Sequence, residues 1–507
     1  WHRDSNLRLY RVGNLMDPSV LVIDLGSSRI RCVRVTVERP WEAEEISSAP
    51  YPVIGARGGS LARSFNVPIL RRRMIDALSR ATQKIPPATI AAIAVTSQRA
   101  AICFFDAHGN TLYVGPNNDT RAVFEGAALD EAHGPDVYKA TGHLPSLLFA
   151  PAKLEWWRVH RPSTAKRIAS VAGLGAWATL QLTGHLVETL PGLAESGLVD
   201  IGSRTVAQQL FRRIGTPTSI TPPVVATGDS VGRLTQDIVA AAGILPSVPV
   251  HIAGPDTQAA TLGVGAISPG QASVVAGWST PVQVVAARLI LDPKRRTWTT
   301  LHAKNDLWLI EANGGDAGRT LDTVRGLLGS RMTPTHFDHL AKSAAQSHGI
   351  ISAFFGPRAL DLSNPGITMG GLLTPAPITY EGLDSRKVAR SALENVSYAI
   401  RECLILARQV AASEGNVSLS GGMAKSAVFP ALLATVLGEP ISVHPDATAS
   451  GAAVIASRTP AEWADVAEEL RRRAVSIEPG HQAREYEETY ERWLRLRRKL
   501  DKLTEEL

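Results

Sequence analysis

The segment VLVIDLGSSRIRCVRV places a carboxylate and a guanidinium on either side of one tight turn. Asp24 ends an apolar run, and Arg31 lies on the returning run with the parity of the valines that follow it. The turn adds backbone N–H groups and hydroxyls from Gly26, Ser27 and Ser28. These groups suit a magnesium-bound polyphosphate, in which Asp24 holds the metal through water and Arg31 neutralises phosphate charge. The alternative is an ordinary hairpin with an Asp–Arg ion pair.

Two later stretches carry polar side chains in predicted loops. In IAAIAVTSQRAAICFFDAHGN, two apolar strands flank a polar loop that contains Gln98 and Arg99. In GPNNDTRA, Asn118, Asp119 and Arg121 offer an amide, a carboxylate and a guanidinium, the groups that grip vicinal hydroxyls. Loops raised between buried strands often carry ligand contacts, and the alternative for both stretches is a plain connecting loop.

The segment HIAGPDTQAATLGVG holds Asp256 where a strand ends and a run of small residues begins. A carboxylate held there can accept a proton from a substrate hydroxyl while that hydroxyl attacks a phosphoryl group. The alternative is an N-cap aspartate without catalytic duty, and the two roles are compatible.

Short β-rich runs alternate with amphipathic helical stretches along the chain, which predicts a layered α/β architecture. The two halves of the chain each contain a predicted strand, a turn with glycine and hydroxyl residues, and a second strand. In the first half these segments are VLVID, LGSS and RIRCVRVTV, and in the second half they are ASVVA, GWSTP and VQVVAA. A third glycine turn, in VSLSGGMAKS, follows a helix predicted over 388–410. Ser426 is the predicted N-cap of the next helix.

Composition limits the class of protein. A chain of 507 residues with 44% hydrophobic and 20% charged residues reads as a globular protein of two or more domains. Its apolar stretches are far too short to span a bilayer. The net charge of +6 is spread without a basic run interleaved with aromatics, so a nucleic-acid partner is not expected. The 3 widely spaced cysteines argue against disulfides and structural zinc, and we expect a cytoplasmic location.

The order of these motifs resembles the FGGY family of carbohydrate kinases, from Val20 to about Ser457. DLGSSRIR is similar to the family's phosphate loop, SQRAA to its sugar loop, NNDTR to its WxDxR segment and GWST to its second phosphate turn. GPDTQAATLGVGAISPG, FFGPR and LSGGMAKSAVFPALLATVLGEPI are similar to the segments that follow in the family. Each motif is weak alone, but seven in the family's order make chance a poor explanation.

The resemblance implies an α/β fold with two RNase H-like domains of the actin and hexokinase superfold around a catalytic cleft. It predicts an N-terminal extension over 1–18, a sugar- and phosphate-binding domain over 19–262, a nucleotide-binding domain over 263–460 and a helical C-terminal tail over 461–507.

The resemblance also implies the site residues and the cofactors, ATP and Mg²⁺. Asp256 matches the catalytic base, and Asp24 the carboxylate that organises magnesium. The expected sugar contacts are Gln98, Arg99, Asn118, Asp119 and Asp256. The expected ATP and phosphate contacts are Gly26, Ser27, Ser28, Arg31, Gly277, Ser279, Gly314, Gly421, Gly422 and Lys425.

Departures from the family pattern concern mainly the substrate. Asn117 replaces the aromatic of WxDxR, as in autoinducer-2 kinases, and Trp278 occupies the second phosphate turn where threonine is usual. The leading interpretation is a xylulokinase-like enzyme for a ketopentose such as xylulose or ribulose. A kinase for another polyol-like substrate, the autoinducer-2 precursor or erythritol, is the second, and a non-catalytic nucleotide-binding regulator is the third. The sequence leaves open whether the enzyme forms a homodimer.

Overall fold

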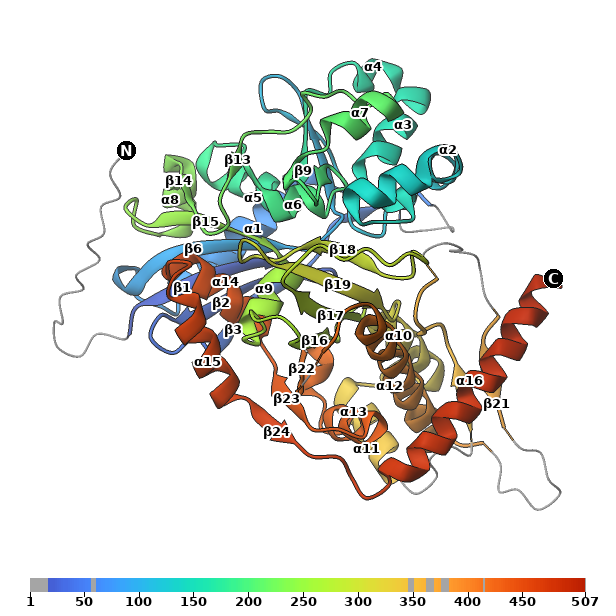
Figure 1. The fold of residues 1–507 in the computed structure, drawn as a ribbon. Coiled ribbons are helices and arrows are strands. Elements are labelled where there is room, and N and C mark those ends of the chain that lie inside the picture. The colour runs from blue at the N-terminus through green and yellow to red at the C-terminus, as the bar shows by residue number, and fades with distance from the viewer. Residues whose placement is uncertain are drawn as a thin grey trace.

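The computed structural model describes residues 17–55, 61–344, 351–361, 369–374, 383–413 and 415–506. The predicted extension over 1–18 therefore lies almost wholly outside the described residues. Two sheets form the centres of two lobes, coloured blue to green and yellow to red in Figure 1. This is the two-domain α/β architecture that the sequence predicts.

The first sheet has six strands in the order β14-β15-β6-β1-β2-β3. Its strands are β1 (Ser19–Leu25), β2 (Arg29–Thr36), β3 (Ala43–Pro50), β6 (Ile90–Ser97), β14 (Ser230–Arg233) and β15 (Pro249–Pro255). Every residue of β1 is buried, because Leu21 and Ile23 pack on one face of the sheet while Val20 and Val22 pack on the other. In the antiparallel β1–β2 pair, Asp24 lies directly opposite Arg31.

The second sheet has seven strands in the order β18-β19-β17-β16-β22-β23-β24. Its strands are β16 (Ala272–Val275), β17 (Pro281–Ala286), β18 (Trp298–Leu301), β19 (Trp308–Asn313), β22 (Val417–Ser420), β23 (Ile441–His444) and β24 (Val475–Ile477). The orders β3-β2-β1-β6-β15 and β19-β17-β16-β22-β23 have matching directions, three antiparallel strands followed by two strands parallel to the third. The repeated strand–turn–strand device of the sequence is thus the start of each sheet.

Helices cover both faces of each sheet. On the first sheet, α1 (Val67–Thr82), α5 (Leu174–Thr183) and α8 (Gln236–Ala242) share one core. On the second, α10 (Ala317–Leu328), α11 (Pro334–Ser343), α12 (Ser385–Val410), α13 (Phe429–Leu437) and α16 (Ala483–Glu505) share another. The predicted helix over 388–410 lies within α12 and is correct. The prediction of Ser426 as an N-cap is wrong by two positions, because Val428 precedes α13, although the hydroxyl of Ser426 accepts hydrogen bonds from the N–H groups of Val428 and Phe429.

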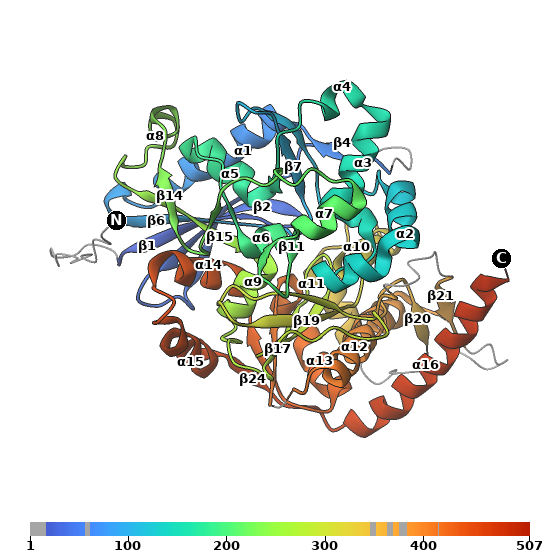
Figure 2. The ribbon, with the colours of Figure 1, turned by 45° about the horizontal axis from the view of Figure 1, so that its top comes forward.

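A small sheet and five helices complete the first lobe. They are β7 (Ile102–Phe105), β8 (Thr111–Val114), β9 (Ser170–Gly173), α2 (Val123–Thr141), α3 (Ala150–His160), α4 (Pro162–Ala165), α6 (Leu190–Ala194) and α7 (Gln208–Ile214). The helices α3, α4 and α7 lie in the outer part of the lobe, at the top of Figure 1, whereas the buried helix α6 lies near the middle of the molecule in Figures 1 and 2. The remaining strands form short pairs: β4 (Val53–Ile54), β5 (Ser64–Phe65), β10 (Glu188–Thr189), β11 (Val199–Asp200), β12 (Thr205–Val206), β13 (Val224–Val225), β20 (Ser352–Phe354) and β21 (Gly371–Leu373).

Two helices cross between the sheets, α9 (Asp256–Gly263) and α14 (Ala447–Ser457) (Figure 1). A Cβ atom on Gly263 would lie 1.9 Å from the carbonyl oxygen of Ala447, and one on Gly451 would lie 1.8 Å from that of Ala259. The helices therefore touch backbone to backbone. Although α14 comes late in the chain, it packs on the first sheet, where its alanines join the valines of β1 and β2 in one core.

The C-terminal tail, predicted to be helical, also contains a strand. Between α15 (Trp463–Arg473) and α16, the strand β24 pairs with β23 and closes the edge of the second sheet. Besides its alternating charges, α16 has an aromatic face: Tyr486, Tyr490 and Trp493 are buried in the core of the second lobe. Charge alternation describes only the outer face of this helix.

Candidate active site

The hairpin of β1 and β2 fixes a carboxylate beside a guanidinium. Nε of Arg31 donates to Oδ2 of Asp24 at 3.0 Å, and Nη2 also contacts that oxygen. The other oxygen, Oδ1 of Asp24, is buried and accepts no hydrogen bond from any residue that the structure describes. A Cβ atom on Gly26 would lie 3.3 Å from that oxygen, so the turn approaches it closely. An acceptor of this kind fits a bound cation or its water shell.

No three His, Cys, Asp or Glu side chains converge on one metal position within the described ranges. A cation held by Asp24 would therefore take its other ligands from water and phosphate oxygens, as magnesium commonly does.

The loop between β6 and β7 lies against this hairpin. Nε2 of Gln98 donates to the carbonyl oxygen of Gly26 at 3.3 Å, while Oε1 of Gln98 accepts from the N–H of Asn117 at 3.1 Å. Nδ2 of Asn117 in turn donates to the hydroxyl of Ser27 at 3.0 Å. The sequence predicts Gln98 and Ser27 in one site, and the structure brings them together through Asn117.

Asp119 is placed differently from the expectation that it contacts sugar. Its carboxylate is fully buried and accepts from Nε of Arg121 at 2.7 Å, from the N–H of Arg63 at 2.7 Å and from the hydroxyl of Tyr113. These bonds occupy both oxygens within the first lobe, so its surroundings favour a structural anchor. Asn118 is half-buried beside it.

Behind the loop, Ala100 has a φ of 53°, a left-handed conformation that is uncommon for a residue with a side chain. Nζ of Lys153, a fully buried lysine, lies 3.5 Å from the carbonyl oxygen of Ala100. Burial lowers the pKa of Lys153 to about 8. Support from a buried side chain is one way in which a strained loop conformation persists.

Arg99 is the centre of a buried cluster that joins the two lobes. Its Nη1 and Nη2 atoms donate to Oε2 and Oε1 of Glu311 on β19 at 2.6 and 2.8 Å, and Nη1 lies 3.5 Å from Oε2 of Glu195. We call these three residues the Arg99 cluster. Glu311 and Glu195 were not expected from the sequence, although a carboxylate inside the apolar strand WLIEAN was a signal for Glu311.

Polar side chains hold both carboxylates of the Arg99 cluster. Glu195 accepts from Nε2 of Gln258 at 2.6 Å and from the hydroxyl of Thr300 at 2.8 Å. Glu311 accepts from Nε2 of Gln283 at 2.8 Å. Burial opposes charge on Arg99, but the two carboxylates outweigh it and raise the pKa of Arg99. Burial likewise opposes charge on Glu195, and the Arg99 charge and these hydrogen bonds lower the pKa of Glu195.

Asp256 lies where β15 ends and α9 begins, as predicted. It is the first residue of the helix, after Pro255 in the cap position, and its Oδ1 accepts from the hydroxyl of Thr257 at 3.1 Å. Burial, followed by the nearby charge of Asp24, raises the pKa of Asp256 to about 7. A carboxylate that titrates near neutrality is well matched to accept a proton.

The glycine turns of the second lobe meet at one corner. A Cβ atom on Gly421, which has a φ of 90°, would lie 2.6 Å from the carbonyl oxygen of Ala276, and the N–H of Gly314 donates to the carbonyl oxygen of Thr280 at 2.9 Å. The turn from Gly277 to Ser279 closes on itself through an N–H to carbonyl bond of 3.1 Å. The structure therefore groups the residues expected to contact nucleotide, which come from three distant segments.

Asp446 bridges this corner to the first lobe. Its Oδ1 accepts from Nζ of Lys425 at 2.7 Å and lies 3.7 Å from Nη1 of Arg31. We call these three residues the Asp446 bridge. Asp446 was not expected from the sequence, and only its position before the small-residue helix ATASGAAVIAS was available as a signal.

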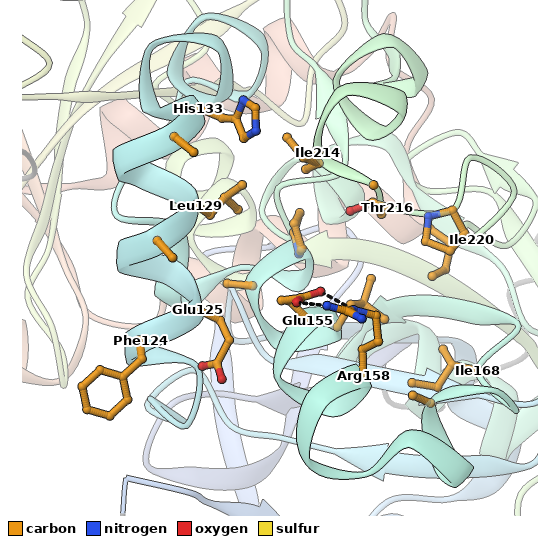
Figure 3. A pocket seen from close by; sticks show the side chains of 18 of the residues that line it. Phe124, Glu125, Leu129, His133, Glu155, Arg158, Ile168, Ile214, Thr216 and Ile220 are labelled. Atoms are coloured by element: carbon orange, nitrogen blue, oxygen red, sulfur yellow. Dashed lines mark hydrogen bonds and ion pairs between the residues drawn. The ribbon is translucent and has the colours of Figure 1, made fainter.

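Two cavities of the described residues lie in different places. A small one of about 20 Å³ is lined by Gln98, Arg99, Glu188 and Glu195, and it reaches Pro255 beside Asp256. Burial raises the pKa of Glu188 there to about 7. A larger one of about 650 Å³ lies in the outer part of the first lobe between α2, α3 and the end of α7, where Glu155 pairs with Arg158 (Figure 3). Its lining is mostly apolar and contains none of the predicted site residues.

Comparison with known proteins places the chain among kinases. Residues 19–263 match the N-terminal domain of the FGGY family of carbohydrate kinases. The chain is 26% identical over 471 residues to the putative sugar kinase YoaC of Bacillus subtilis strain 168, with 90% of this chain and 93% of that protein covered. It is 24% identical over 495 residues to the autoinducer-2 kinase of Salmonella paratyphi A, with 89% and 87% covered.

Solved structures give the same fold at low identity. A gluconate kinase from Lactobacillus acidophilus superposes with a TM-score of 0.81 at 17% identity, covering 96% of this chain and 99% of that one. A ligand-bound xylulose kinase from the same organism superposes with a TM-score of 0.80 at 17% identity, covering 95% and 98%. Within the residues that the structure describes, no helix has the length and apolar character needed to cross a membrane. The chain carries the N-terminal domain of the FGGY family of carbohydrate kinases, and its homologues and structural neighbours indicate an ATP-dependent sugar kinase.

Proposed function

We propose that this kinase transfers the γ-phosphoryl group of ATP to a hydroxyl of a ketopentose such as xylulose or ribulose, with Asp256 as the general base. The observation that carries the proposal is the placement of Asp256, whose pKa of about 7 arises from burial and from Asp24 nearby. In this proposal, residues 19–262 form the domain that binds the acceptor and the phosphates, and residues 263–460 form the domain that binds the nucleotide. Three buried, free cysteines support a cytoplasmic location.

The proposed transfer moves a proton to Asp256 and a phosphoryl group to the acceptor. One oxygen of Asp256 takes the proton of the acceptor hydroxyl while the hydroxyl oxygen forms a bond to the γ-phosphorus. The bond from that phosphorus to the bridging oxygen of ADP breaks, and its electron pair leaves with ADP. Gln98 and Asn117, fixed to the hairpin by the bonds to Gly26 and Ser27, hold the acceptor side of the site against the phosphate side.

The phosphate side depends on charge and on backbone donors. Arg31 and the turn from Gly26 to Ser28 face the triphosphate, and the free oxygen Oδ1 of Asp24 supports a role in holding magnesium. Bound magnesium would neutralise phosphate charge in the transition state. In the second lobe, the turns at Gly277, Ser279, Gly314, Gly421 and Gly422 cradle the nucleotide, and Lys425 contributes positive charge.

A second acceptor class has its own support. The similar proteins by sequence include autoinducer-2 kinases, and Asn117 stands in place of the aromatic residue of the WxDxR segment. Because Asn117 is bonded to Ser27, the phosphate turn is tied to the acceptor loop at this position. The autoinducer-2 precursor and erythritol are therefore the acceptors to compare with the ketopentoses.

The experiment is ADP release from ATP and magnesium with D-xylulose, D-ribulose, L-ribulose, L-xylulose, glycerol, erythritol and the autoinducer-2 precursor. Asp256→Asn is measured beside the parent, and it should lose about 100- to 10,000-fold in kcat because it cannot accept the proton. Parent-like turnover in this variant would remove Asp256 from the base role. Turnover restricted to the autoinducer-2 precursor would replace the ketopentose by that acceptor.

A further inference from the structure

Two buried carboxylates surround one buried guanidinium in the Arg99 cluster. The side chains of Arg99, Glu195 and Glu311 are 11%, 3% and 0% exposed. The Nη1 and Nη2 atoms of Arg99 form parallel hydrogen bonds to the two oxygens of Glu311, an arrangement in which Arg also binds a carboxylate of a ligand. This end of the guanidinium is therefore already occupied by a protein carboxylate.

The charge balance of the cluster is negative. The charge of Arg99 and the hydrogen bonds from Gln258 and Thr300 favour the ionised form of Glu195, while Glu311 forms a two-pronged ion pair with Arg99 and accepts from Gln283. His143 is close, with Nε2 3.9 Å from Oε2 of Glu195, but burial lowers the pKa of His143 and so favours the neutral ring. One positive charge therefore faces two negative charges in a place that water reaches poorly.

This cluster borders the acceptor side of the site. Gln98, Arg99, Glu188 and Glu195 line one small cavity that ends at Pro255, the residue before the proposed base. Arg99 is the one cation among the lining residues of that cavity that the structure describes. A negatively charged acceptor bound beside this cavity and Asp256 would meet the charge of Glu195, while the nearby cation, Arg99, is already paired.

We propose that Glu311 is a specificity-determining residue that restricts the acceptor to uncharged sugars and polyols and excludes aldonates, by keeping the guanidinium of Arg99 paired. The proposal rests on the proposed function, because it concerns the acceptor of that same transfer. The fold leaves the question open, since similar structures include both a gluconate kinase and a xylulose kinase. Glu311 comes from the second lobe, so the nucleotide half of the chain contributes to acceptor choice.

The test compares kcat/KM for D-xylulose and D-ribulose with kcat/KM for D-xylonate and D-gluconate. The parent should prefer the uncharged acceptors. In Glu311→Gln, Arg99 loses its two-pronged ion pair and keeps only the longer contact of 3.5 Å with Glu195, so it can bind a carboxylate of a ligand and the ratio should move toward the aldonates by about tenfold or more. Titration calorimetry without ATP should show D-gluconate binding to the variant and not to the parent.

Matched variants separate charge from packing. Thr300→Val removes a hydrogen bond from the same buried network without changing charge, and its acceptor ratio should stay within about twofold of the parent. Glu311→Asp keeps the charge and should keep the parent's preference. The double variant Arg99→Gln with Glu311→Gln removes the freed cation and should gain no aldonate activity.

The outcomes are distinguishable. ADP release with none of the seven acceptors of the first panel or the two aldonates would overturn the proposed function itself. A parent that prefers an aldonate would overturn the inference while leaving the kinase intact, and this result needs no variant to fold. An unchanged ratio in a folded Glu311→Gln protein, checked by thermal unfolding, would remove Glu311 from acceptor choice.

Discussion

The Arg99 cluster and the Asp446 bridge both join the lobes through ion pairs, but the two groups differ in how far water can reach their charged side chains. The side chains of the Arg99 cluster are at most 11% exposed, and protein groups satisfy its carboxylates. In the Asp446 bridge, Arg31, Asp446 and Lys425 are 21%, 23% and 47% exposed. The comparison teaches that protein groups satisfy the charges on the proposed acceptor side, whereas the proposed nucleotide side keeps cations that solvent can reach.

The largest expected effect is the loss of stability when Arg99 is removed from the Arg99 cluster. Arg99→Leu leaves Glu311 and Glu195 without their guanidinium, and we expect it to lower the free energy of unfolding by about 3–5 kcal/mol. Lys425→Met removes an exposed partner, and its effect should stay below about 1 kcal/mol. Denaturant unfolding of both variants measures the difference.

The control for Arg99→Leu adds a second change. In the double variant Arg99→Leu with Glu311→Leu, one uncompensated carboxylate is gone, so part of the lost stability should return. Equal losses in Arg99→Leu and Lys425→Met would contradict the contrast between a buried and an exposed arrangement.

The second effect concerns the stability contributed by Asp256. The pKa of Asp256 is about 7 in the folded protein, above the ordinary value of 3.8, so the protonated form is favoured by folding. This contribution is complete below about pH 4 and is lost as the pH rises through 7. Asp256→Asn, which keeps a neutral group, should be more stable than the parent by about 4 kcal/mol at pH 8 and nearly equal to it near pH 4.

Thermal unfolding across this pH range provides the measurement. Glu188→Gln is the matched control, since burial also raises the pKa of Glu188 to about 7 and the sign of its effect is the same. A variant less stable than the parent at pH 8 would show that the Asp256 carboxylate is not held at a cost.

The third effect is on the rate. Because a base must be deprotonated to act, kcat/KM of the parent should fall by about tenfold for each pH unit below 7 and level off above it. The residual turnover of Asp256→Asn should lack this slope. A parent profile that is flat from pH 5 to pH 8 would be incompatible with the raised pKa of this carboxylate.

The smallest expected effect is a change in KM for ATP when the charge of Asp446 is removed from the Asp446 bridge. Asp446 competes with phosphates for Arg31 and Lys425, so Asp446→Asn should lower KM for ATP by about two- to threefold at low salt. The difference should disappear at about 0.5 M salt, where exposed charges are screened. A raised KM would mean that Asp446 positions the two cations instead of competing for them.

Much of the fold followed from local patterns. The hairpin of Asp24 and Arg31, the strands around the loop of Gln98, and the strand that ends at Asp256 all depend on runs of apolar residues interrupted by glycine turns, and each is where the sequence predicts. The parity of Arg31 was sufficient to place it on the side of Asp24.

The remaining features depend on distant segments. Arg99 and Glu311 lie 212 positions apart, and nothing near either residue indicates its partner. Asp119 has the composition of a ligand contact, yet Tyr113, Arg121 and Arg63 occupy its carboxylate, because a buried charge recruits whatever donors the tertiary fold supplies. The β24 strand escaped prediction because three residues between two charged helices carry too little pattern.

The contact of α9 with α14 has a mechanical meaning. Gly263 and Gly451 bring two backbones together with no layer of side chains between them. We expect this crossing to act as the pivot of any change in the spacing of the lobes, so that displacement grows with distance from it. Asp256 begins one of these helices and Asp446 precedes the other, so we expect both aspartates to move less than the residues far from the crossing.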